Sequence, residues 1–400
     1  DWFFPYYREK ALMVGLEMPL YDLFLGMLSR EGDPNSNGRN MSEHFSSKEL
    51  RIVSPTACTG SQYLPAVGMA KAVVADGGDE IVYVSSGEGA TSEGEYFEAL
   101  NWASNEKLPV LFVVQNNGYA ISVPQSTQTG AKIADVARGF GMKTVEVDGT
   151  RFTDMYGILK PLIKEMRVKR TPLLIEGHVV RLESHSSSDD QMKYRTENEM
   201  TSANEKDPLV HSEMTLIKEG VLTEKVKQEM HERIEAEVNA AADAADEQPF
   251  PDPAHVMEHI YSSWQPPSED RAPTAISEKP ITMVDAINHG LMEEMKANDK
   301  IVMWGEDIAD PKGGVFGVTR GLTDAFPDRV ANAPLAEASI LGVAHGMAIG
   351  GWKPVVEIQF GDYSFPAFMQ MRNEISTLRW RSAGTWKSPM VVRVAVGGYI

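Results

Sequence analysis

Short apolar runs alternate with stretches of helical spacing along the first half of the chain. Residues 80–85, 109–114 and 173–176 are rich in β-branched and aliphatic side chains and each predict a buried strand, and residues 91–105 predict a helix between the first two. Apolar strands that alternate with helices are typical of a parallel sheet covered by helices on both faces. The first half is therefore expected to be an α/β unit.

The middle of the chain departs from this alternation. Residues 183–200 are polar, and a Ser- and Asp-rich run at 184–190 indicates a mobile loop. Residues 214–246 are highly charged and predict one long helix or a helix pair. Seven prolines follow between positions 249 and 280. Because proline lacks a backbone N–H and has a fixed φ angle, we expect an extended linker there.

The α/β alternation returns after the prolines. We expect helices over residues 284–296, 337–350 and 365–378 and strands over residues 301–304, 354–360 and 390–396. Gly342, Gly346 and Gly350 are spaced four residues apart and therefore share one face of the second helix. Such a glycine stripe permits very close approach of another helix, as at a domain or subunit interface.

Composition and charge exclude several classes of protein. The chain has 38 Lys and Arg against 57 Asp and Glu, a net charge of −19 that would repel a nucleic-acid backbone. No apolar run is long enough to span a bilayer, so no membrane association is expected. Cys58 is the only cysteine, which excludes an intramolecular disulfide and a cysteine-built metal site and fits a reducing compartment.

The first ten residues carry no signal-peptide pattern. The expected location is therefore the cytoplasm of a bacterium, or the mitochondrial matrix if the organism is eukaryotic. The chain also lacks an initiator Met and is expected to begin inside a longer product.

Two turns at consecutive strand ends carry the candidate chemistry. Glycines flank Glu88 after the first strand, and Asn116 and Asn117 follow the second, with 26 residues between Gly89 and Asn116. Glycines let a backbone approach a phosphate closely, and a helix start offers free N–H groups. A hard cation beside a diphosphate needs oxygen ligands, which the Glu88 carboxylate, the Asn117 amide and the Tyr119 backbone carbonyl can supply. Either turn alone fits an ordinary turn, but together they favour a metal–diphosphate site.

The sequence GEG at 87–89 followed by NNGYAIS at 116–122 resembles the thiamine diphosphate motif of 2-oxo acid dehydrogenases. The glutamate within the first element, together with the later sequences SDD at 188–190 and YR at 194–195, is most similar to the motif of the branched-chain decarboxylase component. The likeness to its alpha subunit extends from about residue 6 to 253. Residues 281–400 resemble the amino-terminal half of its beta subunit, so the resemblance implies that the two subunits are fused.

This resemblance implies an α/β fold of two thiamine diphosphate-binding modules with mostly parallel sheets covered by helices. Residues 1–247 would form the alpha-like module that binds the diphosphate, and residues 248–280 the Pro-rich linker. Residues 281–400 would form the beta-like module that binds the pyrimidine. The second module is expected to be incomplete, since an active-site histidine and a carboxyl-terminal domain follow in the family. The cofactor is expected between one module and the other, across a homodimer or a larger homo-oligomer.

The resemblance also assigns roles in the first module. Tyr7 and Arg8 match a pair near the cofactor phosphates, a task that suits the guanidinium fork of arginine. Mg²⁺ would be held by Glu88, Asn117 and Tyr119. Close backbone or side-chain contacts to the cofactor are expected from Gly87, Gly89, Ala90 and Asn117.

Two histidines of the first module match active-site histidines of the family. His44 taken alone is as well explained by a structural role. His185 lies in the Ser- and Asp-rich loop, where a protonatable imidazole can serve acyl transfer to a lipoyl sulfur; its alternative is a solvated loop histidine. Gln115 occupies a position where the branched-chain enzymes have an arginine that contacts the diphosphate. This departure removes one positive charge from the expected site.

In the second module the expected cofactor residues are Leu335, Glu337, Gln359 and Tyr363. The resemblance gives Glu337 the role of holding the pyrimidine N1′ atom, where a buried carboxyl keeps a proton available and favours the reactive tautomer. Its alternative is an acid in the first turn of a helix, favoured by the helix dipole. Alternation along the strand would place Gln359 on the face of Glu357 and Gly361, with structural packing as its alternative.

The resemblance implies oxidative decarboxylation of a 2-oxo acid with thiamine diphosphate and Mg²⁺ as cofactors. The substrate class is expected to be branched, for example 3-methyl-2-oxobutanoate. The acyl group would pass to the lipoyl group of a partner dihydrolipoyl acyltransferase. The alternatives are a pyruvate or acetoin dehydrogenase component, a transketolase-like enzyme without a lipoyl partner, and a non-catalytic scaffold subunit of a multienzyme complex.

Overall fold

A five-stranded parallel sheet forms the centre of the first half of the molecule. The computed structural model describes residues 1–263 and 280–397. The strand order is β1-β2-β3-β7-β6, with each neighbouring pair parallel, so the predicted sheet type is confirmed. The edge strands β1 and β6 were not predicted. The five strands are β1 (Trp2–Phe4), β2 (Val82–Gly87), β3 (Val110–Asn116), β6 (Lys143–Asp148) and β7 (Leu173–His178).

Helices cover both faces of this sheet. One face packs Val84 and Phe112 against α3 and α4, and the other packs Leu111 and Ile175 against Met166 of α6. This burial of two sheet faces is the main apolar stabilisation of the unit. The helices of this half are α1 (Lys10–Gly15), α2 (Leu20–Met27), α3 (Tyr63–Ala75), α4 (Gly94–Asn105), α5 (Ile133–Gly139) and α6 (Phe152–Lys169).

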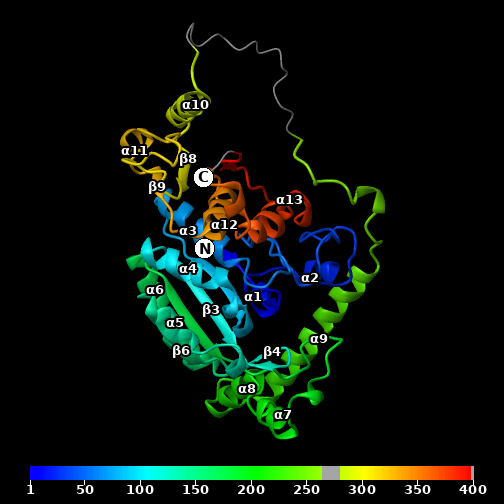
Figure 1. Cartoon of the computed structure of the whole chain (residues 1–400). Helices are drawn as coiled ribbons and strands as arrows, with labels where there is room; N and C mark the ends of the chain where they lie inside the picture. The colour runs from blue at the N-terminus through cyan, green and yellow to red at the C-terminus, as the bar shows by residue number, and fades with distance from the viewer. Residues whose placement is uncertain (264–279, 398–400) are drawn as a thin grey trace.

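Three helices follow the last strand of the first sheet: α7 (Glu197–Asn204), α8 (Pro208–Lys218) and α9 (Glu224–Asp246). The predicted helix pair is confirmed as α8 and α9. Helix α9 runs along the outside of the molecule toward the second half (Figure 1).

The chain after α9 forms a short 3₁₀ turn over Pro253–His255 and contacts both halves. Arg39 Nη2 donates to the His255 carbonyl oxygen at 2.7 Å, and Trp380 Nε1 donates to the Val256 carbonyl oxygen at 2.8 Å. The first part of the expected linker is therefore packed against the protein. Three of the predicted linker prolines, Pro266, Pro267 and Pro273, lie outside the described residues.

A second parallel sheet, in the order β11-β10-β8-β9, forms the centre of the other half. Helices α10 and α12 match two predicted helices, and β8, β10 and β11 match the three predicted strands. The elements are α10 (Met283–Ala297), β8 (Ile301–Gly305), α11 (Leu322–Ala325), β9 (Val330–Asn332), α12 (Glu337–Ile349), β10 (Lys353–Ile358), α13 (Leu378–Arg381) and β11 (Val391–Val394).

The helix predicted over residues 365–378 is wrong in its form. The structure has a π-helical segment over Gln370–Ile375 and then the short helix α13. Gln370 and Glu374 are buried and form hydrogen bonds with the first half of the molecule. Their polar contacts decide the local path, and π-helical segments are common where side chains serve such special contacts.

The two halves meet where α3 and α12 cross at very short range (Figure 1). A Cβ atom added at Gly346 would lie 1.9 Å from the Pro65 carbonyl oxygen, and one at Gly68 would lie 2.0 Å from the Val343 carbonyl oxygen. Glycine is therefore required at both positions. The glycine stripe indeed marks a close helix contact, and one hydrophobic core continues across it.

Among the described residues, no helix combines the length and the apolar character that crossing a membrane requires.

Candidate active site

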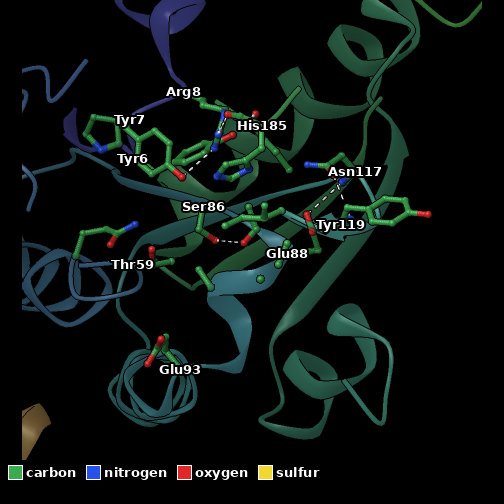
Figure 2. A pocket seen from close by; sticks show the side chains of 18 of the residues that line it. Tyr6, Tyr7, Arg8, Thr59, Ser86, Glu88, Glu93, Asn117, Tyr119 and His185 are labelled. Atoms are coloured by element: carbon green, nitrogen blue, oxygen red, sulfur yellow. Dashed lines mark hydrogen bonds between the residues drawn. The ribbon is translucent and has the colours of Figure 1, made fainter. Parts of the chain in front are cut away.

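A cavity of about 530 Å³ lies where β2, β3 and β7 end. Because these strands are parallel, their carboxyl ends share one edge of the sheet, where α/β proteins commonly bind ligands. The 3₁₀ turn Glu88–Ser92 follows β2, and the small hairpin of β4 (Tyr119–Ala120) and β5 (Val123–Pro124) follows β3. The volume is within the range of small-molecule sites. Figure 2 shows Glu88 connected to Asn117 by a hydrogen bond, while the Tyr119 ring points away from them.

Most residues predicted for the first module meet in this cavity. The lining includes Tyr7, Arg8, Gly87, Glu88, Gly89, Ala90, Asn117, Tyr119 and His185.

Glu88 is a buried carboxylate with one oxygen left free. Its side chain belongs to a residue that is only 2% exposed, and its Oε2 accepts a hydrogen bond from the Asn117 backbone N–H at 3.3 Å. Its Oε1 is buried and has no hydrogen-bond partner among residues 1–263 and 280–397. Burial raises the pKa of Glu88, opposed by backbone hydrogen bonds and by the charges of Arg181 and Arg8. An unpaired buried carboxylate oxygen is costly, and a bound cation would remove that cost.

The oxygen atoms around Glu88 fit a hard cation that is also bound by oxygen atoms of a ligand. Asn117 Oδ1 accepts from the Tyr119 backbone N–H at 3.1 Å, which fixes the amide at the cavity edge. In the part of the chain that the structure describes, no group of three or more His, Cys, Asp and Glu side chains could hold a metal ion. A cation here would therefore combine one carboxylate with amide, carbonyl and ligand oxygens.

The glycines that flank Glu88 differ in their surroundings. A Cβ atom at Gly89 would lie 2.7 Å from the Ala120 Cβ, so this position lets the turn pack directly against the hairpin. A Cβ atom at Gly87 would meet no atom within 4 Å, which places this backbone next to open space. A phosphate could therefore approach the main chain at the end of β2.

Two arginines give the cavity wall a positive charge. Arg8 donates to the Tyr7 hydroxyl at 2.9 Å and to the His185 carbonyl oxygen at 2.7 Å. Arg181 donates to the Ile121 carbonyl oxygen and to a tyrosine hydroxyl, both at 2.8 Å. All four partners are uncharged oxygens, so both guanidinium charges remain available to an anionic ligand.

Gln115 lines the cavity and belongs to a partly buried hydrogen-bond network. Its Nε2 donates to Glu9 Oε1 at 2.8 Å, and its Oε1 accepts from the Tyr6 hydroxyl at 3.1 Å. The Tyr83 hydroxyl also donates to Glu9 Oε1, at 2.8 Å. Burial raises the pKa of Glu9. The amide of Gln115 is therefore committed to protein partners and adds no positive charge for a diphosphate.

Residues 184–190 form a loop, as predicted, and hydrogen bonds connect the part that carries His185 to its surroundings. The His185 backbone N–H donates to Asp189 Oδ2 at 2.8 Å, and the Tyr194 hydroxyl donates to the same oxygen at 2.5 Å. Burial and the charges of Arg8 and Arg181 lower the pKa of His185. A neutral imidazole therefore faces the cavity near pH 7.

His44 lies behind the cavity wall and does not line it. Its ring stacks on Tyr7 with centroids 6.0 Å apart, and its Nδ1 is 3.1 Å from the Ser42 carbonyl oxygen. Burial lowers the pKa of His44. In this geometry His44 supports the ring of Tyr7. A catalytic role for His44 stays a prediction.

The predicted residues of the second module form a separate group. Leu335, Glu337, Gln359 and Tyr363 do not line the cavity of the first module. They lie after the carboxyl ends of β9 and β10, at one edge of the second sheet. Leu335 is 82% exposed, and Tyr363 is exposed beside Phe360. This group therefore lies apart from the cavity of its own chain.

Gln359 lies one position after β10, which ends at Ile358. The backbone stays extended at Phe360, and the face expected for Gln359 stays a prediction. Its Nε2 donates to Asp307 Oδ2 at 2.8 Å. Glu357 instead forms a buried ion pair with Arg393.

Glu337 is the first residue of α12 and is half-buried among other acids. Burial raises the pKa of Glu306 and of Glu98, and the nearby charge of Glu337 adds to both shifts. Glu306 Oε1 is buried, and no residue that the structure describes forms a hydrogen bond with it. Glu337 therefore lies among carboxyl groups whose pKa values are raised above their ordinary range.

Sequence reasoning missed two parts of the cavity. Arg181 follows the end of β7 by three positions, so the strand-end rule that selected Glu88 and Asn117 could have selected it as well. The second part is a loop before α3, for which the sequence offers no strand-end signal. Its lining residues are Pro55, Thr56, Ala57, Cys58 and Thr59.

Comparison with known proteins supplies the family. Residues 1–254 match the family described as Dehydrogenase E1 component, and residues 279–399 match the family described as Transketolase, pyrimidine binding domain. The chain is similar to the 2-oxoisovalerate dehydrogenase subunit alpha of Bacillus subtilis, with 36% identity over 263 residues that cover 66% of this chain and 80% of that protein.

Two further relatives have related names. The pyruvate dehydrogenase E1 component subunit alpha of Staphylococcus aureus is 32% identical over 263 residues, covering 65% of this chain and 68% of that protein. The 2-oxoisovalerate dehydrogenase subunit alpha of Pseudomonas aeruginosa is 32% identical over 270 residues, covering 66% of each. From the family match and these relatives together, the chain belongs to the dehydrogenase E1 component family of thiamine diphosphate-dependent 2-oxo acid dehydrogenases.

Proposed function

We propose that this protein catalyses the oxidative decarboxylation of a branched-chain 2-oxo acid such as 3-methyl-2-oxobutanoate. The acyl group would pass to the lipoyl group of a partner dihydrolipoyl acyltransferase. The observation that carries the proposal is the unpaired buried oxygen of Glu88, which lies with two unneutralised arginines around one cavity. In a cation bound to a diphosphate, the cation would pair with the Glu88 carboxylate and the diphosphate with the two arginines. Branched-chain specificity is supported by the 36% relative named for 2-oxoisovalerate, against 32% for the pyruvate relative.

The cavity residues fit thiamine diphosphate and Mg²⁺. Glu88, Asn117 and the Tyr119 carbonyl would hold the cation. Arg8 and Arg181 would hold the diphosphate, because their positive charges attract its negative charge. Gly87, Gly89, Ala90 and Tyr7 would complete the contacts of this end of the cofactor. When bound, the cofactor supplies the electron sink that decarboxylation of a 2-oxo acid requires.

The remaining steps belong to side chains of the protein. Glu337 would bind the pyrimidine N1′ atom through its carboxyl group, which stands at the first position of α12. His185 is neutral near pH 7 and can accept a proton at the cavity mouth during acyl transfer. Arg8 bonds to the carbonyl oxygen of His185 and would keep that loop over the ligand.

The proposed site needs a second copy of the chain. The Glu337 group does not line the cavity of its own chain, yet a thiamine cofactor has to reach both. Leu335, Phe365 and Phe368 are exposed apolar side chains near this group, and burying them against a partner would stabilise an oligomer. We therefore propose a homodimer or larger homo-oligomer in which one copy supplies the diphosphate site and another supplies Glu337.

The proposal includes fusion of alpha-like and beta-like parts in one chain. The two family matches support modules over residues 1–247 and 281–400, joined by a linker over 248–280. The relatives come from bacteria, which supports the bacterial cytoplasm as the location.

Initial rates with an artificial electron acceptor test the function. We expect turnover that depends on thiamine diphosphate and Mg²⁺, with a higher kcat/KM for 3-methyl-2-oxobutanoate than for pyruvate. Comparable or better use of pyruvate would contradict the branched-chain assignment and leave the cofactor assignment intact. Absence of cofactor-dependent turnover with every 2-oxo acid would favour a scaffold subunit. The uncharged Gln115 supports that alternative, because it removes one positive charge from the expected diphosphate site.

A further inference from the structure

A buried ion pair of the second half of the molecule reaches the cavity wall of the first half. Glu374 and Arg381 are each 3% exposed, and Arg381 Nη2 is 2.6 Å from Glu374 Oε2. The same guanidinium nitrogen donates to the Ser54 carbonyl oxygen at 2.9 Å. Ser54 begins the loop that continues through Thr59 along the cavity.

The second oxygen of Glu374 holds the same loop at two more points. Glu374 Oε1 accepts from the Ser61 hydroxyl at 2.5 Å and from the Thr56 hydroxyl at 3.2 Å. Thr56 Oγ1 in turn accepts from the Cys58 backbone N–H at 3.2 Å, and Ser61 Oγ lies 2.9 Å from the Cys58 carbonyl oxygen. One carboxylate therefore fixes both sides of the turn around Cys58.

A buried histidine completes the surroundings of this carboxylate without adding charge. His345 Nε2 is 3.9 Å from Glu374 Oε2, and its Nδ1 is 2.8 Å from the Ser388 hydroxyl. Burial and the charge of Arg381 lower the pKa of His345 to about 3. His345 is therefore neutral near pH 7, and Arg381 is the cation that balances Glu374.

We propose that Glu374 is a positioning residue for the cavity: through Thr56 and Ser61 it holds the wall formed by residues 55–59. It does not line the cavity and acts only through that loop. The second half of the molecule then shapes the ligand site of its own chain, in addition to the group that it presents to another copy. The effect of Glu374 on the loop does not depend on the proposed function. Its effect on binding of cofactor and substrate rests on that function.

The chain offers a matched control for this role. Glu357 is also buried in the second half and also forms an ion pair with an arginine, Arg393. Its pair joins β10 to β11 and has no hydrogen bond to residues 54–62. Glu374→Gln and Glu357→Gln therefore remove the same charge from similar surroundings, but only the first touches the cavity wall.

Cys58 provides a reporter that does not depend on any ligand. It is the only cysteine of the chain, it is half-buried, and it lines the cavity. Its rate of modification by dithionitrobenzoate, measured without cofactor and well below the unfolding temperature, reports the opening of this loop. We expect Glu374→Gln to raise this rate about ten-fold, as expected from losing hydrogen bonds to a charged group, and Glu357→Gln to change it less than about two-fold.

Thr56→Val is the second variant, because Glu374→Gln leaves Arg381 buried without its partner and can prevent folding. Thr56→Val keeps the ion pair and removes one link to the loop, so a smaller increase of about three-fold is expected. Equal rates for wild type and both loop variants, or equal increases in Glu374→Gln and Glu357→Gln, would overturn the positioning role.

Thiamine diphosphate titrations, followed by protein fluorescence, test the consequence for the ligand. A positioning role predicts a higher Kd for the cofactor or a higher KM for the 2-oxo acid in Glu374→Gln, with both values close to wild type in Glu357→Gln. If wild type binds no cofactor, the proposed function fails, while the Cys58 rates still decide the role of Glu374.

Discussion

At the residue scale, the cavity combines one buried carboxylate with two arginines that form no ion pair with any carboxylate of the described residues. Glu88 keeps a free oxygen because its backbone partner satisfies only the other one. Arg8 and Arg181 bond to neutral oxygens on the facing wall. The protein alone therefore leaves opposite charges incompletely satisfied, and a ligand that carries both signs would satisfy them together.

Removing the charge of Glu88 tests this arrangement. Glu88→Gln keeps the shape but weakens the hold on a divalent cation, so we expect thiamine diphosphate binding in the presence of Mg²⁺ to weaken by about 2–3 kcal/mol. Fluorescence titration at several Mg²⁺ concentrations measures this loss. Glu93→Gln is the control, because Glu93 lines the same cavity but is exposed. Similar losses in both variants would argue against a cation at Glu88.

Glu95 predicts a pH-dependent contribution to stability. Its Oε1 accepts from Gln370 Nε2 at 3.0 Å, its Oε2 has no partner, and burial raises its pKa from 4.5 to about 7. Between these pH values the folded protein keeps a proton that the unfolded chain has lost, so stability falls as pH rises through this interval. Glu95→Gln removes this loss.

The Glu95→Gln variant is therefore expected to be more stable than wild type by about 3 kcal/mol at pH 8 and by less than about 1 kcal/mol at pH 5. Urea unfolding at the two pH values measures the difference. Glu235→Gln, on the exposed side of α9, is the control and should show no such dependence. A Glu95→Gln effect that is equal at both pH values would mean that Glu95 does not titrate in this interval.

The sequence predicted those site residues that depend on local position. Glu88, Asn117 and Tyr119 follow buried strands, and parallel strands bring their ends together without further information. The wall at residues 55–59 could not be predicted in this way. Its position depends on hydrogen bonds such as that between Ser61 and Glu374, which are 313 positions apart.

At the scale of elements, the crossing of α3 and α12 fixes the two halves of the molecule together. The glycine stripe of α12 predicted a close helix contact, but it could not name the partner helix, since α3 has no comparable pattern. The helix predicted over residues 365–378 failed for a related reason. Its polar side chains form hydrogen bonds with buried partners in the other half. The spacing of hydrophobic residues gives no information about such contacts.

Gly346→Ala tests the crossing directly. The added Cβ would lie 1.9 Å from the Pro65 carbonyl oxygen, so the two helices would have to separate. We expect a loss of about 2–4 kcal/mol in the free energy of unfolding, measured with urea. Gly290→Ala is the matched control in α10, where a Cβ meets nothing within 4 Å. It should be neutral or stabilising by up to about 1 kcal/mol, and equal destabilisation by the two variants would contradict the steric argument.

At the scale of the whole molecule, the two sheets present their ligand edges in different places. The cavity lies at the carboxyl ends of β2, β3 and β7, while Glu337 and Gln359 lie at the carboxyl edge of the other sheet. The sequence predicted both α/β units and the parallel form of their sheets. Only the family resemblance implied a cofactor shared between copies, because the hydrophobic pattern does not show how the two halves pack.

Mixing two inactive variants tests whether two copies share a site. Glu88→Gln damages the cavity and Glu337→Gln damages the other group, so each variant alone should be inactive. If sites are formed between copies, a dimer with one chain of each variant has one intact site, and random mixing restores about a quarter of wild-type activity. Co-expression followed by rate measurement checks this. Mixtures that remain inactive would place Glu88 and Glu337 of a single chain in the same site.

Strand β1 connects the edge of the first sheet to the ligand. It pairs with β2 through Trp2 opposite Val82, and three positions after it ends the chain supplies Tyr7 and then Arg8 to the cavity wall. Arg167 also forms an ion pair with Asp1 at 2.8 Å. A change in the pairing of β1 with β2 would therefore shift residues that contact the ligand, so an engineer who needs an attachment point should choose a surface remote from this strand, such as the exposed side of α9.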